Sequence, residues 1–530
     1  MIGGTDRSRQ VHVAALALVA VMLPWSEFLV SNAQFLLVGN WLIGGLVHRD
    51  LAQRFRRAFT DPTALVFLSF FGLHVLGLLW TEDLDWGLDL CRILLPVLAF
   101  TPVLAERERL TAGELRTILL LGAWSTVAST LACLALRYAA IADGGYRELS
   151  VFISHIRLAL LLCFSAVVFL HHLSSAWLVR VAQLAAVAWC LVFLNLLGSL
   201  TGIVLLAVLA GWGAWRWSRA RGRAVRWSVG LLLLALPVVG VLLLRPVVAE
   251  HYRASPIDLA HLPDRSAGGE VYLHDRRDPL RENGRYVWIN VADGELERGW
   301  ARRSAIPYFG GKDARDQPVR FTLLRYMTSM GLNKDSVGLA ALGAEDVRRI
   351  EQGVTNVRSG RVGMLRERID QVLYELERYH ATGNASGFSV AMRLEFLRTG
   401  WSIARAHLLT GVGTGDTRPA FAQAYAQADS PLEDRWRLRA HDQYLTLWIS
   451  FGLPGLLWSL FSWWWPARRI AAHRHPMFIA WAIIFGVSAL AEDTLETQMG
   501  ATFFVFHYTL FVFAAPQAVS APAVPAPARG

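Results

Sequence analysis

The chain has 530 residues, of which 54% are hydrophobic and 18% charged, and its formal net charge is +10. A soluble protein of this length exposes more charge, so the composition excludes a soluble globular class and favours repeated membrane crossings of about 17–25 apolar residues each. In such a chain the positive charge is first a signal of membrane topology, so we expect no nucleic-acid partner. All four cysteines lie in apolar windows, which argues against a disulfide framework or a cysteine metal site.

The apolar windows predict an all-α polytopic membrane protein with about twelve transmembrane helices; the close spacing of the first two leaves eleven or thirteen open. The first window follows Arg7 and Arg9 like a signal peptide, but no small-residue cleavage site ends it, so we expect a retained span. The windows are residues 11–29, 32–47, 63–80, 88–105, 117–137, 153–171, 177–197, 200–216, 228–246, 442–465, 476–491 and 499–515.

The charges of the loops predict the orientation of these spans. Loops after even-numbered spans are rich in arginine, as in "HRDLAQRFRR", "ERER", "RWSRARGRAVR" and "ARRIAAHRH". Loops after odd-numbered spans are acidic or neutral, as in "TEDLDWG" and "AEDTLETQ", and only "RYAAIADGGYRE" fits less well. Because cytoplasmic loops carry the excess of lysine and arginine, the pattern places the N-terminus in the cytoplasm and the long segment after the ninth span outside it.

This topology predicts four parts: an N-terminal transmembrane region at 1–250 with about nine spans, a periplasmic insert at 251–440, a C-terminal transmembrane region at 441–516 with about three spans, and a disordered Pro/Ala-rich tail at 517–530. Within the insert, "GEVYLHD" and "GRYVWINV" around "ENG" predict strands joined by a turn, and "GRVGMLRERIDQVLYELERYH" predicts an amphipathic helix. The insert is therefore expected to be an α+β subdomain. Residues 393–408 predict a second amphipathic helix, lying along the membrane surface.

Ionisable side chains gather near the outer ends of the predicted spans. Such groups are costly in a membrane and usually mark function, so together they predict one outward-facing polar cavity. The alternative is that each is an interfacial side chain that reaches the headgroups. The set comprises Arg92, His155, Arg157, His441, Glu492, Asp493 and Glu496.

The arginines and one histidine suggest the chemistry of that cavity. Arg157, Arg393 and Arg92 are fixed planar cations suited to phosphate oxygens, so they predict binding of a lipid carrier through its diphosphate. For Arg393 the alternative is a salt bridge with Glu395. His441, directly before a span, can take a proton from an attacking hydroxyl; alternatively it caps the span or contacts a headgroup.

The turn "GVGTGD" supplies Gly411, Gly413 and Gly415, which allow the backbone to lie close to a ligand. It matches neither a P-loop nor a dinucleotide-binding fingerprint. Asp416 is expected to cap the helix that starts at Thr417. The Asp-x-Asp in "TEDLDW" fits a cation site, but an ordinary acidic loop is the better interpretation, and we predict no metal and no cofactor.

Two of these stretches carry a family resemblance. "RLEFLRTGWSIARAHLLTGVGTGD" followed by "HDQYLTLWISFGLPGLL" resembles the C-terminal signature of the O-antigen ligase and polymerase family. In that signature an arginine precedes a tryptophan, a Gly-x-Gly turn follows, and a histidine opens a span. Two positions depart from the pattern: Asp442 stands where asparagine is usual, and Leu200 stands where ligases often carry an arginine. The signature positions are filled by Arg393, Trp401, Gly411, Gly413 and His441.

The resemblance implies a GT-C-like membrane glycosyltransferase of the bacterial inner membrane, inverting and metal-independent. It would move a glycan from undecaprenyl diphosphate to a hydroxyl of lipid A-core, or of another acceptor, on the periplasmic face. His441 would be the base or would orient the acceptor, and Arg393 would stabilise the leaving diphosphate. Arg157, Arg92, His155, Glu492 and Glu496 join them from the residue analysis alone. The open alternatives are a polysaccharide polymerase of the same family and a transporter of lipid-linked glycans.

Overall fold

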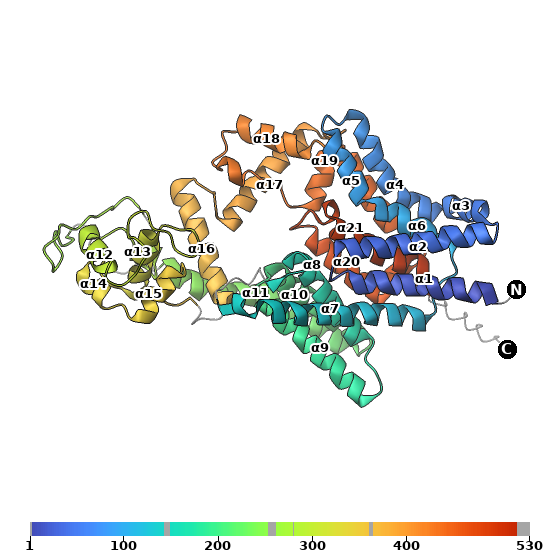
Figure 1. Ribbon diagram of the computed structural model, residues 1–530, viewed down its shortest axis with the longest axis horizontal. Helices are drawn as coiled ribbons and strands as arrows, with labels where there is room; N and C mark the ends of the chain where they lie inside the picture. Colours follow the sequence, from blue (N-terminus) through green and yellow to red (C-terminus); the bar gives the residue numbers. More distant parts are fainter. Residues whose placement is uncertain (1–2, 143–148, 253–260, 279, 360–363, 517–530) are drawn as a thin grey trace. The chain divides into compact units, whose positions relative to one another are not determined.

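The computed structural model describes residues 3–142, 149–252, 261–278, 280–359 and 364–516. The described chain is mostly helical (Figure 1). It packs as two compact units. Unit 1 comprises Met1–Arg216, Phe396–Ser430 and Arg437–Gly530, and unit 2 comprises Trp217–Glu395 and Pro431–Trp436. This division follows packing, whereas the predicted boundaries follow membrane topology. The predicted disordered tail lies outside the described residues.

Unit 1 is built from apolar helices whose lengths follow the apolar windows of the sequence. Two of its helices, α10 and α17, also contribute residues to unit 2. The α-helices with residues in unit 1 are α1 (Gly3–Met22), α2 (Glu27–Val47), α3 (Leu51–Thr60), α4 (Pro62–Gly77), α5 (Leu84–Ile93), α6 (Leu95–Glu106), α7 (Ala112–Ala142), α8 (His155–His171), α9 (Trp177–Leu196), α10 (Leu200–Arg219), α17 (Ser389–Ala406), α18 (Thr417–Gln427), α19 (Gln443–Arg469), α20 (Pro476–Ser488) and α21 (Gln498–Thr509). The shorter helical turns are η1 (Leu78–Trp80), η4 (Ala472–Arg474), η5 (Thr494–Glu496) and η6 (Leu510–Ala514).

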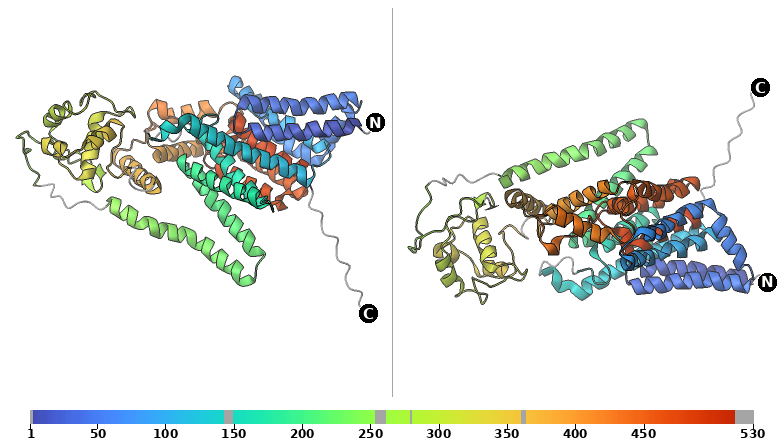
Figure 2. Two further views of the ribbon diagram at one scale, coloured as in Figure 1. Left: turned by 60° about the horizontal axis from the view of Figure 1, so that its bottom comes forward. Right: turned by 90° about the horizontal axis from the view of Figure 1, so that it is seen from above.

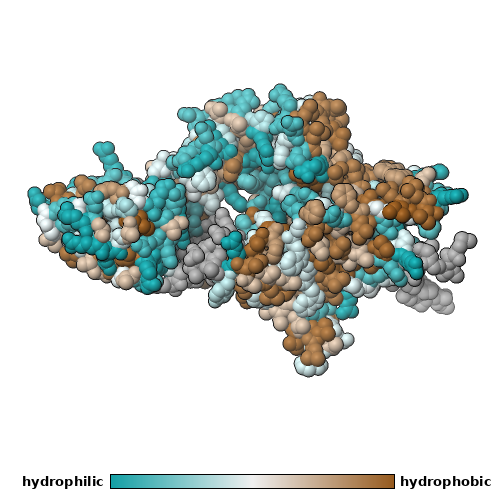
Figure 3. Space-filling view, viewed as in Figure 1, coloured by the Kyte–Doolittle hydropathy of each residue, from teal (hydrophilic) through white to brown (hydrophobic). Residues whose placement is uncertain are grey.

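Among the described residues, seven helices are long and apolar enough to cross a membrane, and three further apolar helices are shorter. The multi-pass membrane class is therefore confirmed, while the number of twelve spans stays a prediction. Figure 3 shows apolar side chains over much of the surface of unit 1. The seven are Glu27–Val47, Pro62–Trp80, Leu84–Glu106, Ala112–Tyr138, Trp177–Leu196, Arg223–Glu250 and Gln443–Arg469, and the shorter three are His155–His171, Pro476–Ser488 and Gln498–Ala514.

One helix of unit 1 lies where the sequence predicted a loop. The arginine-rich stretch after the second window forms α3, which packs against α4 and α6. Arg54 in α3 is buried, forms an ion pair with Asp50 at 2.8 Å and donates a hydrogen bond to the carbonyl oxygen of Trp41 at 3.0 Å. The loop prediction was wrong because it rested on the charge of the segment alone, whereas the segment forms a helix that buries one face.

Aromatic side chains on α21 contribute to the core of unit 1. Every residue of this helix from Met499 to Thr509 is buried, and α21 packs against α6 and α20. The ring of Tyr508 stacks on Phe67 of α4, with their centroids 4.1 Å apart. The two views of Figure 2 show α1 and α2 side by side, as their packing requires.

A bend in α19 connects it to the glycine turn of residues 411–415. Gly452 has φ 68° and ψ 178°, which interrupts the helix, and Pro454 follows. The amide of Leu453 donates to the carbonyl oxygen of Leu408 at 2.7 Å, so the segment just before the turn supplies the acceptor that the helix lacks at this point. A β-carbon at Gly452 would lie 2.3 Å from the carbonyl oxygen of Leu409, so the close packing requires glycine.

Unit 2 has its own core and consists mainly of short helices. Its largest buried side chains include Trp300, Leu323, Tyr326 and Met327. The predicted amphipathic helix after residue 360 is observed as α16, and the helix predicted at 393–408 is observed as α17 with slightly different bounds. The elements are α11 (Arg223–Tyr252), β1 (Arg281–Glu282), β2 (Arg285–Tyr286), α12 (Asp293–Trp300), α13 (Val319–Met330), α14 (Ser336–Ala340), α15 (Ala344–Glu351), α16 (Met364–Thr382) and η3 (Asp434–Trp436).

The strands of unit 2 are shorter than the sequence predicted. β1 and β2 form an antiparallel hairpin of two residues each around Asn283-Gly284, where both φ angles are positive, as a tight hairpin turn requires. "GEVYLHD" pairs with "GRYVWINV" through an isolated antiparallel bridge between Leu273 and Val291 and a hydrogen bond from the amide of Asp275 to the carbonyl oxygen of Trp288 at 2.7 Å, without forming a continuous ladder. The turn prediction was correct, but the described part of the insert is helical with one small hairpin.

Candidate active site

The loop between α20 and α21 gathers the polar residues of unit 1. Gln443, the first residue of α19, holds this loop at two points: its amide donates to the carbonyl oxygen of Ala489 at 2.8 Å, and its side-chain oxygen accepts from the amide of Leu495 at 2.7 Å. Thr497 then caps α21 by accepting from the amide of Gly500. Polar side chains at the start of α19 therefore fix the loop beside His441.

Two arginines pair with carboxylates of this loop. Arg157, buried in the first turn of α8, lies 3.7 Å from Glu492 and donates to the hydroxyl of Thr497 at 3.1 Å. Arg439, two residues before His441, forms an ion pair with Glu496. We define the ionic cluster as Arg157, Arg439, His441, Glu492, Asp493 and Glu496.

Asp493 lies between the histidine and Arg439. Its Oδ1 accepts a hydrogen bond from the hydroxyl of Thr446 at 2.8 Å. Its Oδ2 is buried and has no hydrogen-bond partner among the described residues; it lies 3.8 Å from Nδ1 of His441 and 3.9 Å from Nη2 of Arg439. A buried carboxylate oxygen without a partner is costly, so a small approach of the imidazole N–H would be favourable. The geometry resembles that of a general base, His441, and a carboxylate, Asp493, that orients it. In such pairs the hydrogen bond is often long without substrate and shortens when substrate binds.

The backbone presents His441 in an uncommon conformation. Its φ is 51°, in the left-handed region, which histidine adopts more readily than most non-glycine residues. Its side chain is 37% exposed, so the imidazole remains accessible beside a buried carboxylate. The next residue, Asp442, caps α19 by accepting from the amide of Leu445 at 2.9 Å. Aspartate and asparagine cap helices equally well, so the departure at Asp442 preserves this structural role.

Burial and neighbouring charges shift the pKa values of Glu496 and Arg439. Burial raises the pKa of Glu496, and the charge of Asp493 raises it further, while Arg439 opposes both. For Arg439, burial alone would lower the pKa, but the carboxylates of Glu496 and Asp493 raise it. With three ionised carboxylates, two arginines and a neutral histidine, the cluster carries a formal charge of −1. Both arginines thus have carboxylate partners within the cluster, which the sequence did not predict.

A tryptophan connects the cluster to α18. The guanidinium carbon of Arg418 lies 3.4 Å from the ring centroid of Trp86, and that of Arg439 lies 5.9 Å from it. Arg418 is exposed, whereas Trp86 is half-buried. Since cations are attracted to the faces of an indole ring, Trp86 holds two arginines near each other. Arg418 and Arg439 are therefore candidate anion-binding groups that sequence reasoning missed, because both lie in polar segments where arginine is common.

The glycine turn is bound to protein backbone. The amides of Val412 and Gly413 donate to the carbonyl oxygens of Ile449 and Ser450, each at 2.9 Å. A β-carbon at Gly411 would lie 2.3 Å from the carbonyl carbon of Ser450, and one at Gly415 would lie 2.0 Å from a backbone oxygen of the loop before α5. The amide of Gly415 donates to the hydroxyl of a threonine in that loop at 3.2 Å. Close packing against other backbone segments of the same protein thus explains these glycines. A direct role of the turn in ligand binding stays a prediction.

Asp416 occupies the capping position of α18, but its carboxylate makes no capping hydrogen bond. It accepts instead from the amides of Glu82 and Asp83 at 2.8–3.1 Å. The capping prediction was wrong in its mechanism because a distant loop supplies the donors. Asp83 itself caps α5 by accepting from the amide of Trp86 at 3.0 Å, which supports the interpretation of this Asp-x-Asp as an ordinary loop. Within the described ranges, no group of three His, Cys, Asp or Glu side chains is arranged to hold a metal ion.

Three predicted residues, Arg92, His155 and Arg393, are described by their position in the fold. The side chain of Arg92, on α5, is 61% exposed and forms an ion pair with Asp89 at 2.7 Å. His155 lies half-buried at the first position of α8. Arg393 lies in the part of α17 that belongs to unit 2. Their roles in substrate binding stay predictions.

Comparison with known families bears on the segment that carries His441. Residues 354–460 match the family model described as O-Antigen ligase. This match supports an O-antigen ligase-like family for the segment that carries His441. The resemblance predicted from the two signature stretches is therefore confirmed. A comparison with curated proteins finds no match.

The O-antigen ligase-like segment supplies only part of the ionic cluster. Arg439 and His441 lie inside residues 354–460, whereas Arg157, Glu492 and Asp493 lie outside them. The family assignment supports a ligase or polymerase type of enzyme, and the structure adds the carboxylates that lie beside the histidine and the arginines.

Proposed function

We propose that the protein is an inverting, metal-independent glycosyltransferase that moves a glycan from undecaprenyl diphosphate to a hydroxyl acceptor, such as lipid A-core. The reaction would take place at the periplasmic face of the bacterial inner membrane. The observation that carries the proposal is the position of His441: it lies two residues before α19, within the O-antigen ligase-like segment, and 3.8 Å from a buried carboxylate oxygen of Asp493 that has no hydrogen-bond partner among the described residues.

In this mechanism Asp493 accepts from Nδ1–H of His441, which leaves Nε2 as the proton acceptor. The acceptor oxygen forms a bond to the anomeric carbon while the bond from that carbon to the diphosphate oxygen breaks. The hydroxyl proton passes to Nε2 of His441, and the imidazolium is stabilised by Asp493. Attack on the face opposite the diphosphate inverts the anomeric configuration.

The leaving diphosphate requires cations, and those of the cluster are paired with carboxylates. Because burial raises the pKa of Glu496, protonation of this carboxyl group releases Arg439 to bind phosphate oxygens. Arg418, across Trp86, adds a second exposed guanidinium. Diphosphate is a good leaving group, so such electrostatic stabilisation is sufficient without a metal ion. Arg157, Arg393 and Arg92 are further candidates for the same anion.

The test uses the full-length protein in detergent with a lipid-linked glycan and a lipid A-core acceptor. Asparagine tolerates the left-handed backbone of residue 441, so His441→Asn removes the base while keeping the conformation. We expect transfer to fall at least about 100-fold, the usual effect of a general base. His407→Asn, an exposed histidine of the same segment outside the cluster, is the matched control and keeps activity.

Full transfer by the His441→Asn protein would contradict the proposal. Loss of activity on chelation of divalent cations would contradict metal independence. Products that lengthen the carrier-linked glycan without reaching the acceptor would identify a polymerase of the same family.

A further inference from the structure

Unit 2 contains a cavity of about 590 Å³, within the size range of small-molecule sites. It is lined by residues from α11, the β1–β2 hairpin, α13, α16 and the segment at 431–436. No residue of the ionic cluster lines it. The cavity is therefore separate from the proposed transfer site.

The charges of this cavity favour an anion. Seven arginines and five carboxylates line it, so its formal charge is +2 with all of them ionised. Arginine forks bind carboxylate and phosphate oxygens with two parallel hydrogen bonds, and neutral ligands have no need of so many cations. The five carboxylates make the lining unsuited to a nucleic acid, whose many phosphates they would repel.

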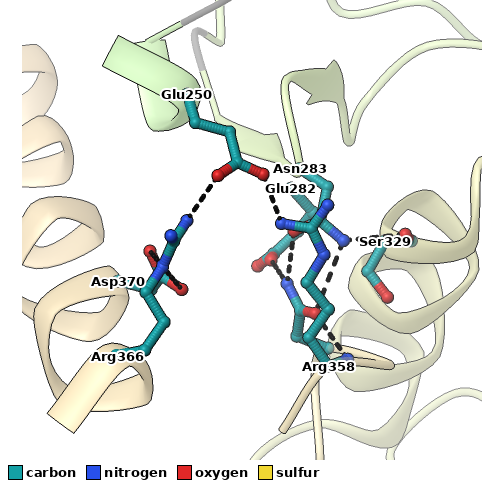
Figure 4. Close-up of polar contacts among 8 residues, drawn as sticks. Glu250, Glu282, Asn283, Ser329, Arg358, Arg366 and Asp370 are labelled. Carbon is teal, nitrogen blue, oxygen red and sulfur yellow. Dashed lines mark hydrogen bonds and ion pairs between the residues drawn. The ribbon is translucent and has the colours of Figure 1, made fainter. Parts of the chain in front are cut away.

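One carboxylate of the protein shows how an anion fits there. Glu250, near the end of α11, accepts from Arg358 at 2.8 Å through one oxygen and from Arg366 at 2.9 Å through the other (Figure 4). The two arginines come from different segments, and Arg366 also pairs with Asp370 at 3.0 Å. Glu250 is 46% exposed, so its contact with the arginines is open to competition by an anion from solution.

The other lining groups suit a sugar. Four aromatic side chains, including Tyr374 and Trp436, reach the cavity, and such rings offer flat apolar faces to the C–H groups of a pyranose. Asparagine, glutamine and threonine side chains also line the cavity and can bind hydroxyl groups. Arg325 is fixed over the ring of Tyr374 at 4.1 Å and paired with Glu282, so this wall of the cavity is preformed.

We propose that this cavity binds a saccharide that carries carboxylate or phosphate groups, and that Glu250 holds the position that one such group takes. The inference rests on the proposed function for the source of the saccharide, which is either the glycan of the lipid-linked donor or the oligosaccharide of the acceptor. In both cases the insert would bind the substrate through its charged sugars.

The experiment measures binding to the full-length protein in the His441→Asn background, without a lipid-linked donor, so that no transfer takes place during the measurement. The probes are trigalacturonate, glucose 6-phosphate and the neutral maltotriose. We expect at least one anionic probe to bind about tenfold more tightly than maltotriose, as one charged hydrogen-bonded contact allows. Arg366→Gln should weaken that binding about tenfold.

Two further variants separate this role from a structural one. Glu250→Gln removes the competing carboxylate, so it should strengthen binding of the anionic probe, which a misfolded protein cannot do. Arg348→Gln, an exposed arginine on α15 that does not line the cavity, should leave binding unchanged. Equal affinity for charged and neutral probes, or no strengthening by Glu250→Gln, would overturn the inference.

Competition identifies the source of the saccharide. Displacement of the bound probe by the glycan released from the carrier assigns the cavity to the donor, and displacement by deacylated core oligosaccharide assigns it to the acceptor. Displacement by neither overturns the inference. Because binding is measured without turnover, its failure leaves the transfer chemistry of His441 untouched, and loss of transfer with binding intact concerns only that chemistry.

Discussion

Replacing Asp493 by asparagine tests the role of the carboxylate beside His441. The change keeps the shape of the side chain and its acceptor for Thr446, but removes the charge that would stabilise the imidazolium. At the observed 3.8 Å, two unit charges with an effective dielectric constant of ~20 attract each other by about 4 kcal/mol. That corresponds to roughly 1,000-fold in rate. Because the histidine is 37% exposed, solvent screens part of this attraction, and we expect kcat to fall about 100-fold.

The assay follows transfer of the lipid-linked glycan by purified protein over a range of pH. Asp442→Asn is the matched control: it removes a neighbouring carboxylate whose role is to cap α19, which asparagine also does, so activity should stay within about twofold. A folded Asp493→Asn protein with wild-type kcat and an unchanged pH profile would refute the orienting role. A matching loss in Asp442→Asn would show that charge at this end of α19 acts without specificity.

Three further variants test contacts outside the base. Gly411 has a φ of 69°, and Gly411→Ala places a β-carbon 2.3 Å from the carbonyl carbon of Ser450, so thermal unfolding should show that the free energy of unfolding falls by at least about 3 kcal/mol. The control Gly39→Ala, at a glycine with open space around it, should be neutral or stabilising. Equal effects of the two variants would contradict the packing argument. Asp416→Ala removes the acceptor of two backbone amides and should lower stability by about 2 kcal/mol, and an unchanged midpoint of unfolding would argue against this contact. Burial lowers the pKa of Lys334 in unit 2 to about 7, so on raising the pH this lysine loses its proton in the folded state before it does so in the unfolded state. The free energy of unfolding should therefore rise from pH 7 towards pH 10.5, by up to about 1.4 kcal/mol per pH unit. Hydrogen exchange of α13 should show this rise in the wild type and not in Lys334→Met, and parallel pH profiles of the two proteins would contradict the argument.

The helices of unit 1 were largely predictable because lipid imposes a minimum apolar length on each span. The same argument failed for α3, since an amphipathic helix with three arginines resembles a loop when charge alone is counted. The strands around Asn283 were also predicted incorrectly. The alternation of side chains suggested longer paired strands than unit 2 contains. Hydropathy therefore located the helices but not the packing of the insert.

The site was predictable in part. Arg157 and His441 stood out because ionisable groups next to apolar stretches are rare. Arg439 was missed because it lies in a polar segment, where nothing in the sequence separates a partnered arginine from a solvated one. The pairing of Arg157 with Glu492 joins residues more than 300 positions apart, and only the packing of α8 against α20 brings them together.

The bend at Gly452 has a consequence for how the chain assembles. A break in a helix within hydrocarbon leaves amide and carbonyl groups without partners, each at a cost of several kcal/mol. Here the loop at 408–413 supplies those partners: Leu453 donates to Leu408, while Ile449 and Ser450 accept from Val412 and Gly413. The bent form of α19 is thus stable only once this loop has reached it. The bend and this loop therefore form together, so the shape of the helix that follows His441 depends on a segment that precedes it in the chain.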